Sequence, residues 1–260
     1  MLSDSNRLGF AEMRVADQAA DAGEYAAAAA AEAIERAIFE RGRARVIFAS
    51  ATSQRDLLAA LASDPRIAWD RVDAFHMDEY RGLDAQDPRC FGQWLQDRLP
   101  EAAQAGLHRM DGTASIEEEV QRYGQLLAAS PIDLTCLGIG VNGHIAFNEP
   151  HHTRFDDDAV VRLVEIDVIS RRQQVDEGLF ASLEDVPHQA LSLTVPAVLS
   201  AATVVATVVG QAKAKAVQVA LESSIGAHCP ATALRLHPNV SIFLDRAAAA
   251  DLSDASLSAV

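Results

Sequence analysis

Two short segments of this sequence combine residue types that could do acid/base chemistry. In the first, Phe75 to Tyr80, an apolar strand-like run leads directly into the adjacent carboxylates Asp78 and Glu79. A carboxylate at the carboxyl end of a strand, partly desolvated by apolar neighbours, has its pKa raised enough to remove a proton from carbon. The same pair also suits a solvated acidic turn or a helix N-cap, where Asp and Glu are favoured. These residues alone leave both interpretations open.

The second segment, Leu137 to Pro150, reads LGIGVNGHIAFNEP. Its three glycines permit a tight turn whose backbone N–H groups, including that of Gly143, face an anion or an oxyanion. His144 is a candidate for moving protons, and Glu149 for orienting its imidazole. A lone histidine is often a structural residue, but the glycine before it and the polar residues after it favour function. The glycines do not form a dinucleotide-binding fingerprint, because no helix follows immediately.

A third set of residues could bind phosphate. Ser50, Thr52 and Ser53 follow an apolar run and precede a helical stretch, so hydroxyls and free N–H groups meet at a helix start. Helix capping explains the same hydroxyls equally well. Lys213 also follows a strand-like run at a helix start, where the macrodipole disfavours a lysine unless an anion is present. We therefore take Lys213 as a phosphate candidate.

Composition limits the partners of the chain. Its 260 residues carry 37 acidic and 22 basic side chains, a formal charge of −15, which opposes broad contact with nucleic acid or an anionic membrane. A small anionic ligand needs only a few local cations, so a small anion remains a suitable partner. The three cysteines lack zinc-like spacing, and we expect reduced thiols, no metal and a cytoplasmic location. The sequence leaves a homo-oligomer open.

The elements that must position these residues alternate between strand and helix. EYAAAAAAEAIERAIFE, from Glu24 to Glu40, predicts a long close-packed helix that stops before Gly42, and Ser115 to Glu118 predicts a capping box at the start of another helix. Apolar runs rich in β-branched residues predict buried strands. They are Arg45 to Ala49, Val72 to Met77, Ile132 to Ile139, Leu191 to Val195, Thr203 to Val209 and Val240 to Leu244. The alternation predicts one α/β domain with a mostly parallel sheet flanked by helices on both faces.

One region departs from this alternation. Residues 151–187 are rich in charge and poor in clear periodicity, and we expect a lid there. Arg171 and Arg172 in this region could close over the same anion as Lys213, although paired arginines also suit a solvated helix face. From about residue 247 the chain is small and polar, and we expect it to fray.

With these residues collected, the chain resembles the glucosamine-6-phosphate deaminase family, which shares a modified Rossmann-like fold with the 6-phosphogluconolactonases. The resemblance covers roughly residues 57–245 and lies in several long motifs in order. These are FHMDEYRGL at 75–83, GIGVNGHIAFNEP at 138–150, VPHQALSLTVPAVL at 186–199, VVGQAKAKAV at 208–217 and LRLHP at 234–238.

The resemblance implies an activity, the conversion of glucosamine 6-phosphate and water to fructose 6-phosphate and ammonia in amino-sugar catabolism, without a cofactor. It implies that Asp78 shuttles a proton between C2 and C1 of the open-chain sugar, with Glu79 in support. His144 opens the pyranose ring with Glu149 as its partner.

The resemblance also implies a phosphate clamp. Lys213 holds the phosphate beside the loop from Ser50 to Ser53, and Arg171 or Arg172 completes the clamp.

Three departures from the family pattern bear on function. The familiar deaminases carry Asp where this chain has Asn142, so His144 should be less basic, and either Glu149 carries more of the relay or the substrate differs. The first phosphate loop reads ASATSQ instead of a glycine-rich threonine turn. The lid segment SRRQQVDEGLFASLEDVP is longer than in the familiar deaminases.

Two rival functions share this fold or this pocket. A 6-phosphogluconolactonase uses a histidine in a similar loop, but lactone hydrolysis gives no role to a C2 base such as Asp78. A non-catalytic sugar-phosphate sensor would keep the pocket and lose part of the proton relay, which Asn142 suggests.

Overall fold

Seven parallel strands form the centre of the molecule in the computed structural model, which describes residues 10–150 and 152–257. In sheet order they are β1 (Glu12–Ala16), β10 (Val240–Asp245), β9 (Thr203–Val208), β6 (Leu134–Leu137), β2 (Ala44–Phe48), β3 (Val72–His76) and β5 (Leu107–His108). The predicted single α/β domain with a mostly parallel sheet is confirmed. The edge strands β1 and β5 were not predicted, because β1 alternates exposed and half-buried residues and β5 has only two residues.

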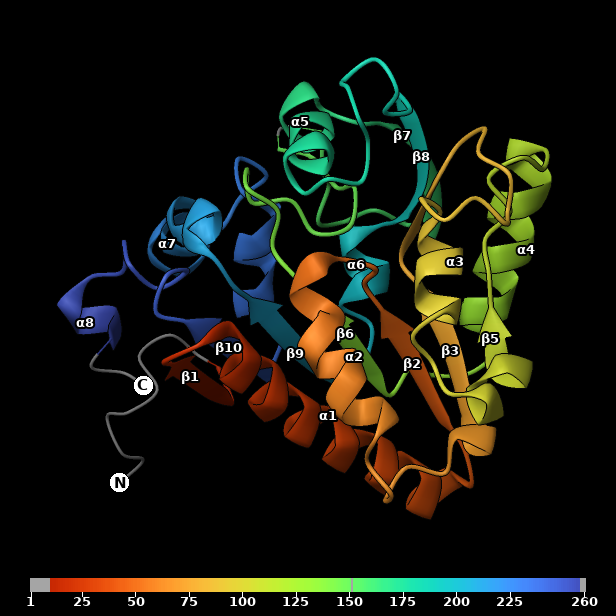
Figure 1. Cartoon of the computed structure of the whole chain (residues 1–260), viewed down its shortest axis with the longest axis horizontal. Helices are drawn as coiled ribbons and strands as arrows, with labels where there is room; N and C mark the ends of the chain where they lie inside the picture. Colours follow the sequence, from red (N-terminus) through yellow and green to blue (C-terminus); the bar gives the residue numbers. More distant parts are fainter. Residues whose placement is uncertain (1–9, 151, 258–260) are drawn as a thin grey trace.

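Helices cover both faces of this sheet. One face carries α1 (Ala19–Arg41), α2 (Arg55–Ala62) and α3 (Phe91–Gln96); the other carries α4 (Ile116–Ala128), α6 (Val195–Val198) and α7 (Ala214–Glu222). Figure 1 shows α1 and α2 side by side across the front of the sheet. Short 3₁₀ turns complete the layers: η1 (Thr52–Gln54), η2 (Trp69–Arg71), η3 (Glu101–Gly106), η4 (Gln211–Lys213) and η5 (Pro230–Leu236).

The alanine-rich helix is confirmed and its packing explains its composition. Small side chains along α1 are buried, which lets its backbone approach the sheet and α2 closely. A Cβ at Gly23 would lie 2.4 Å from the Cβ of Asp56, so the crossing of α1 and α2 needs glycine there. The helix ends at Gly42, which adopts a left-handed φ of 78° and donates its N–H to Ile38.

A second, three-stranded antiparallel sheet lies beside the ends of the first. It consists of β4 (Asp78–Tyr80), β8 (Gln189–Leu193) and β7 (Val161–Glu165), and Figure 1 shows β7 and β8 with α5 (Val168–Asp176) at the top of the molecule. The strand expected at Leu191 to Val195 therefore exists but starts earlier, and it belongs to this small sheet. Its apolar run looked like a parallel core strand because the small sheet is also buried against other elements.

The predicted capping box at the start of α4 is wrong in its contacts. Ser115 occupies the N-cap position, but its side chain makes no cap bond and its hydroxyl lies 3.3 Å from Glu117 instead. Glu119, one residue later than expected, is the buried acidic residue, and it accepts the backbone N–H of Asp111 and pairs with Arg122. The helix itself, with Tyr123 buried on its inner face, is as predicted.

The end of the chain is more ordered than expected. Ala248, Ala249 and Leu252 pack into the main core, and α8 (Asp254–Leu257) follows, so fraying from residue 247 is incorrect for the described residues. Apolar burial of these small side chains outweighs the polar character of the segment. Residues 258–260 and His151, which fall in the expected tail and lid, lie outside the described residues.

Strand order fixes where a ligand site must lie. From β2 the chain first moves outward to β3 and β5, and then crosses to the other side of β2 to form β6 and β9. In open parallel sheets, ligands bind at such a reversal, beyond the carboxyl ends of the two strands. The loops after β2 and β6 are the serine-threonine segment and the glycine-histidine segment singled out above.

Candidate active site

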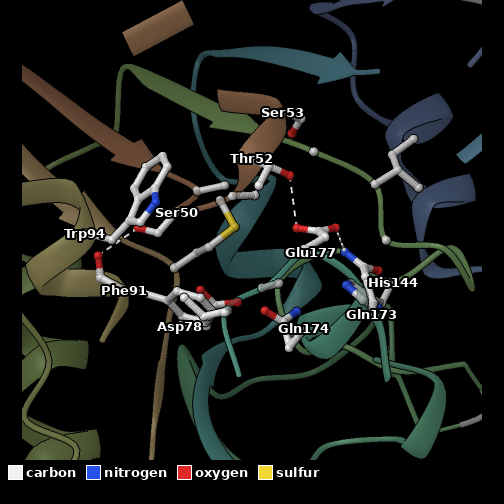
Figure 2. A pocket seen from close by; sticks show the side chains of 18 of the residues that line it. Ser50, Thr52, Ser53, Asp78, Phe91, Trp94, His144, Gln173, Gln174 and Glu177 are labelled. Carbon is white, nitrogen blue, oxygen red and sulfur yellow. Dashed lines mark hydrogen bonds between the residues drawn. The ribbon is translucent and has the colours of Figure 1, made fainter. Parts of the chain in front are cut away.

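A pocket of about 220 Å³ lies at this reversal point. The loops after β2, β3, β6 and β9 form its floor, and α5 with the residues after it forms a wall from the opposite side. Figure 2 shows Asp78 on one side of the pocket and His144 on the other, with Gln174 between them and Glu177 above. The strand ends thus bring together side chains that are far apart in the sequence.

Asp78 is the carboxylate that faces the pocket. It is the first residue of β4, where pairing with Ser192 of β8 fixes its backbone. Burial raises the pKa of its carboxyl well above the ordinary value, and the negative charge of neighbouring Glu79 raises it further. A carboxylate with a raised pKa is a stronger base once it is ionised, which suits proton removal from carbon.

Glu79 does not line the pocket. It points the opposite way from Asp78 along β4, and its two oxygens accept backbone N–H groups of Tyr80, Phe91 and Gly92 at 2.9–3.0 Å. Burial raises its pKa to about 7 despite these hydrogen bonds. Glu79 therefore holds the start of α3 and acts on Asp78 through its charge.

His76 fixes the backbone of Asp78 through a hydrogen bond. The backbone N–H of Met110 donates to Nε2 of His76 at 2.9 Å, so Nδ1 carries the proton and donates to the carbonyl of Asp78 at 2.8 Å. Burial lowers the pKa of this imidazole to about 4 and keeps it neutral. His76 was not predicted as a functional residue, because a histidine inside an apolar strand resembles any other core residue.

His144 presents one ring nitrogen to the pocket and uses the other for support. Nδ1 lies 2.8 Å from Oδ1 of Asn142 and 2.8 Å from the hydroxyl of Ser170. Because the amide oxygen of Asn142 can only accept, Nδ1 carries the proton and Nε2 keeps its lone pair for a ligand. Burial, together with the positive charge of Lys213, lowers the pKa of His144 to about 3, so the imidazole is neutral.

Glu149 lies behind the histidine instead of in direct contact with it. Its Oε2 accepts from Nδ2 of Asn142 and from the hydroxyl of Ser170, both at 2.9 Å, while Nδ1 of His144 is 3.7 Å away. Burial raises the pKa of Glu149 against the effect of these hydrogen bonds. Asn142 and Ser170 are therefore the groups that join the carboxylate to the imidazole.

The glycines of the loop serve close packing more than anion binding. A Cβ at Gly140 would lie 2.1–2.4 Å from ring atoms of His144. Gly143 has a φ of +86° and packs against Cys229, and its N–H donates to the carbonyl of Gly140. The expected binding of substrate by the N–H of Gly143 is incorrect in this structure, because that N–H is already used within the turn. The residue instead positions His144.

The opposite end of the pocket contains the predicted anion-binding groups. Ser50, Thr52, Ser53 and Lys213 all line it, with the loop after β2 leading into η1 and α2. Ser50 donates its hydroxyl to the carbonyl of Phe91, so it shapes the wall. Burial lowers the pKa of Lys213, whose ammonium lies inside the cavity wall.

The two lid arginines do not line the active-site pocket. Arg171 is buried and donates to the backbone carbonyls of Leu183 and Val186, which fixes the segment after α5. Arg172 is exposed on the outer side of α5. Neither arginine lines the active-site pocket, although Arg172 lines a neighbouring cleft that also includes Lys213 and Glu177. The predicted clamp by Arg171 is therefore incorrect, because its guanidinium is used by these backbone carbonyls, and a clamp by Arg172 stays a prediction.

Several pocket residues were missed. Ser170, Gln173, Gln174 and Glu177 of α5 and its C-cap face the site, at spacings of three, four and seven residues that place them on one side of a helix. Arg55 of α2 and Arg98 also line the pocket. The helical spacing of polar residues in the expected lid was the signal that could have identified the four residues of α5 and its C-cap.

Among the described residues, no group of three or more His, Cys, Asp or Glu side chains is arranged to hold a metal ion. In the same part of the chain, no helix is long and apolar enough to span a membrane. Cys90, Cys136 and Cys229 are buried free thiols.

The fold and the pocket together define an α/β enzyme that does acid/base chemistry beyond the carboxyl ends of a parallel sheet. Residues 17–242 match the family model of glucosamine-6-phosphate isomerases/6-phosphogluconolactonase, and the chain belongs to that family.

Named relatives support this assignment. The glucosamine-6-phosphate deaminase of Streptococcus sanguinis is 36% identical over 175 residues, which is 66% of this chain and 72% of that protein. The deaminase of Bacillus cereus strain B4264 is 35% identical over 187 residues, 71% and 70% of the two chains.

Solved structures agree with the fold. A monomeric glucosamine-6-phosphate deaminase superposes with a TM-score of 0.84 at 28% identity, covering 92% of this chain and 99% of that one. A 6-phosphogluconolactonase from Shewanella baltica has a TM-score of 0.72 at 17% identity, covering 90% and 96%, and so shares the fold alone.

Proposed function

We propose that the protein is a glucosamine-6-phosphate deaminase, which converts glucosamine 6-phosphate and water to fructose 6-phosphate and ammonia in amino-sugar catabolism. One observation carries the proposal: a buried carboxylate base, Asp78, and a neutral imidazole, His144, line the same small pocket, with Lys213 at its anion end. The similarity to named deaminases at 34–36% identity supports the same activity.

His144 opens the pyranose ring in this proposal. Its Nε2 lone pair accepts the proton of the anomeric hydroxyl and returns a proton to the ring oxygen, which breaks the C1–O5 bond and leaves the open-chain aldehyde. The imidazole must start neutral for this step, and burial keeps it so. Asn142 and Ser170 hold the ring in the required tautomer.

Asp78 then moves a proton along the sugar. Its carboxylate removes the proton from C2 and delivers it to C1, while the aldehyde oxygen gains a proton and the amine nitrogen loses one. The aldehyde with its C2 amine thus becomes a C1 alcohol with a C2 imine. Water adds to the imine carbon, and ammonia leaves as the ketone forms. The steps transfer protons and exchange amine for water without net oxidation, so they require no redox cofactor.

Lys213 and the hydroxyls of Thr52 and Ser53 hold the 6-phosphate in this arrangement. A cytoplasmic location is part of the proposal. A sugar phosphate is charged and does not cross a bilayer unaided, and free thiols are typical of reducing compartments.

Two parallel assays on purified protein test the activity. Glucosamine 6-phosphate should release ammonia and fructose 6-phosphate in equal amounts, whereas 6-phosphogluconolactone should not be hydrolysed above its spontaneous rate. The N-acetylated sugar phosphate is a matched control, because its amide nitrogen cannot leave as ammonia. Lactone hydrolysis without deamination would replace the proposal with the lactonase, and binding without any turnover would leave a sensor.

A further inference from the structure

Glu177 lies where the substrate's anion is expected to bind. It follows the last residue of α5, and its Oε2 accepts the hydroxyl hydrogen of Thr52 at 2.9 Å. Its Oε1 lies 3.4 Å from the ammonium of Lys213. Figure 2 shows this carboxylate directed across the pocket to Thr52. The two protein groups best placed to bind a phosphate are therefore already bound to a carboxylate of the protein itself.

The contacts of Glu177 tie α5 to the pocket floor. Nε2 of Gln173 donates to Oε1 of Glu177 at 2.7 Å, and Oε1 of Gln173 accepts the backbone N–H of Val141 at 3.0 Å. The ion pair with Lys213 thus joins the wall formed by α5 to the turn after β9. A carboxylate with these partners substitutes for one face of a phosphate group, which also accepts from a hydroxyl and an ammonium.

Glu177 can leave this position more easily than the buried residues around it. A quarter of its side chain, 24%, is exposed, and it precedes Gly178, which has a φ of +78°. The pocket lining carries three cations, Arg55, Arg98 and Lys213, against the carboxylates of Asp78 and Glu177. The electrostatic attraction of these cations for a doubly charged phosphate is therefore stronger than their attraction for the single charge of Glu177.

We propose that Glu177 is a specificity-determining residue, an internal anion that occupies the phosphate site and that only a phosphorylated sugar displaces. The inference deepens the proposed function and rests on it for the identity of the natural ligand. An unphosphorylated amino sugar offers no anion to replace the contacts of Glu177 with Thr52 and Lys213, so it leaves the carboxylate in place. Competition from Glu177 lowers affinity for phosphate but excludes neutral sugars.

Calorimetric titration with inorganic phosphate tests the competition directly and requires no turnover. Glu177→Gln keeps the size of the side chain and removes its charge, and it should bind phosphate roughly tenfold more tightly than the wild type. Asp176→Asn removes the same charge one residue earlier, from an exposed side chain outside the active-site pocket, and should change phosphate affinity by less than about twofold.

Steady-state kinetics give an independent readout for the same variants. The KM for glucosamine 6-phosphate should fall in Glu177→Gln, and the KM for glucosamine should fall by a larger factor, so that the ratio of the second KM to the first decreases. Glu177→Ala and a thermal unfolding scan show whether any loss reflects folding. Weaker or unchanged phosphate binding in both Glu177 variants overturns the inference. If the Glu177 variants bind phosphate more tightly but the wild type does not deaminate glucosamine 6-phosphate, the inference about Glu177 stands and only the proposed function is wrong.

Discussion

The amide nitrogen of Asn142 donates to Oε2 of Glu149 at 2.9 Å, and this bond sets the charge state of the whole histidine relay. With Nδ2 facing the carboxylate, Oδ1 must face His144, which keeps the proton on Nδ1. The negative charge of the relay therefore lies on Glu149, behind the amide. The chain uses asparagine to transmit orientation to the imidazole without placing a charge beside it.

Exchange of this asparagine gives the sharpest test of the relay. Asn142→Asp places two carboxylate oxygens about 3 Å apart, at the distance of the present hydrogen bond, so one must take up a proton. We expect lower stability and lower kcat. The double variant Asn142→Asp with Glu149→Gln restores the hydrogen bond with reversed roles and should recover activity relative to Asn142→Asp; a fully additive loss would contradict the arrangement.

Asp78→Asn should abolish turnover and leave binding intact. The amide has the shape of the carboxylate but cannot accept the C2 proton, so kcat should fall by about 10³-fold or more while the Kd for a substrate analogue changes little. Rapid-mixing kinetics and calorimetry measure the two quantities. Strongly weakened binding would instead mark Asp78 as a structural residue of β4.

Glu79→Gln should shift the pH dependence of catalysis. The charge of Glu79 contributes to the raised pKa of Asp78, so a neutral amide should move the acidic limb of the kcat/KM profile to lower pH. The amide also fails to accept all three backbone N–H groups, and we expect a loss of about 1–3 kcal/mol in the free energy of unfolding. An acidic limb at the wild-type pH would show that Glu79 does not act on Asp78.

His144→Asn should make the protein less sensitive to acid. Burial holds the folded-state pKa of His144 at about 3, below the ordinary 6.5, so its contribution to stability is present above pH 6.5 and is lost as pH falls toward 3. When pH falls from 7 to 5, the free energy of unfolding of the wild type should therefore decrease by about 2 kcal/mol more than that of the variant. Denaturant titrations at both pH values measure this difference; a constant offset would contradict a neutral buried imidazole.

Arg171→Met should lower the free energy of unfolding but leave the KM for glucosamine 6-phosphate nearly unchanged. The guanidinium satisfies the carbonyls of Leu183 and Val186, and its removal should cost about 1–3 kcal/mol. Arg172→Met, a matched exchange at an exposed neighbour, should cost less than about 0.5 kcal/mol. Lys213→Met should raise the KM for glucosamine 6-phosphate roughly tenfold or more. A comparable KM effect in either arginine variant would restore the clamp predicted from the sequence.

Much of the fold could be predicted because its core strands are buried on both faces and its helices have long periodic patterns. The strands β2, β3, β9 and β10 begin within a residue of the expected positions. The small sheet could not be predicted, because β8 has the same apolar composition as a central strand and only tertiary packing separates the two. Partner choice depends on contacts that one strand's sequence does not contain.

The site was partly predictable for a related reason. Asp78 and His144 follow strands, and strand ends converge at one edge of a parallel sheet. The wall formed by α5 could not be predicted from apolar periodicity, because its inward face carries polar residues. These are Ser170, Gln173, Gln174 and Glu177. A helix that covers a polar pocket shows its period in polar residues. Arg171 and Arg172 were predicted to bind the anion from their charge alone, and charge does not indicate which way a side chain points.

The antiparallel pairing of β7 with β8 has a consequence for how this family can diversify. The segment between the two strands supplies the α5 wall, and the N–H of Ile166 donates to the carbonyl of His188 at 2.8 Å, so the segment leaves and rejoins the body at adjacent points. Insertions are tolerated where both ends of a segment are fixed close together. Residues 167–187 thus form a modular cassette, which evolution or a designer can exchange to retune ligand selection while β4 keeps Asp78 in place.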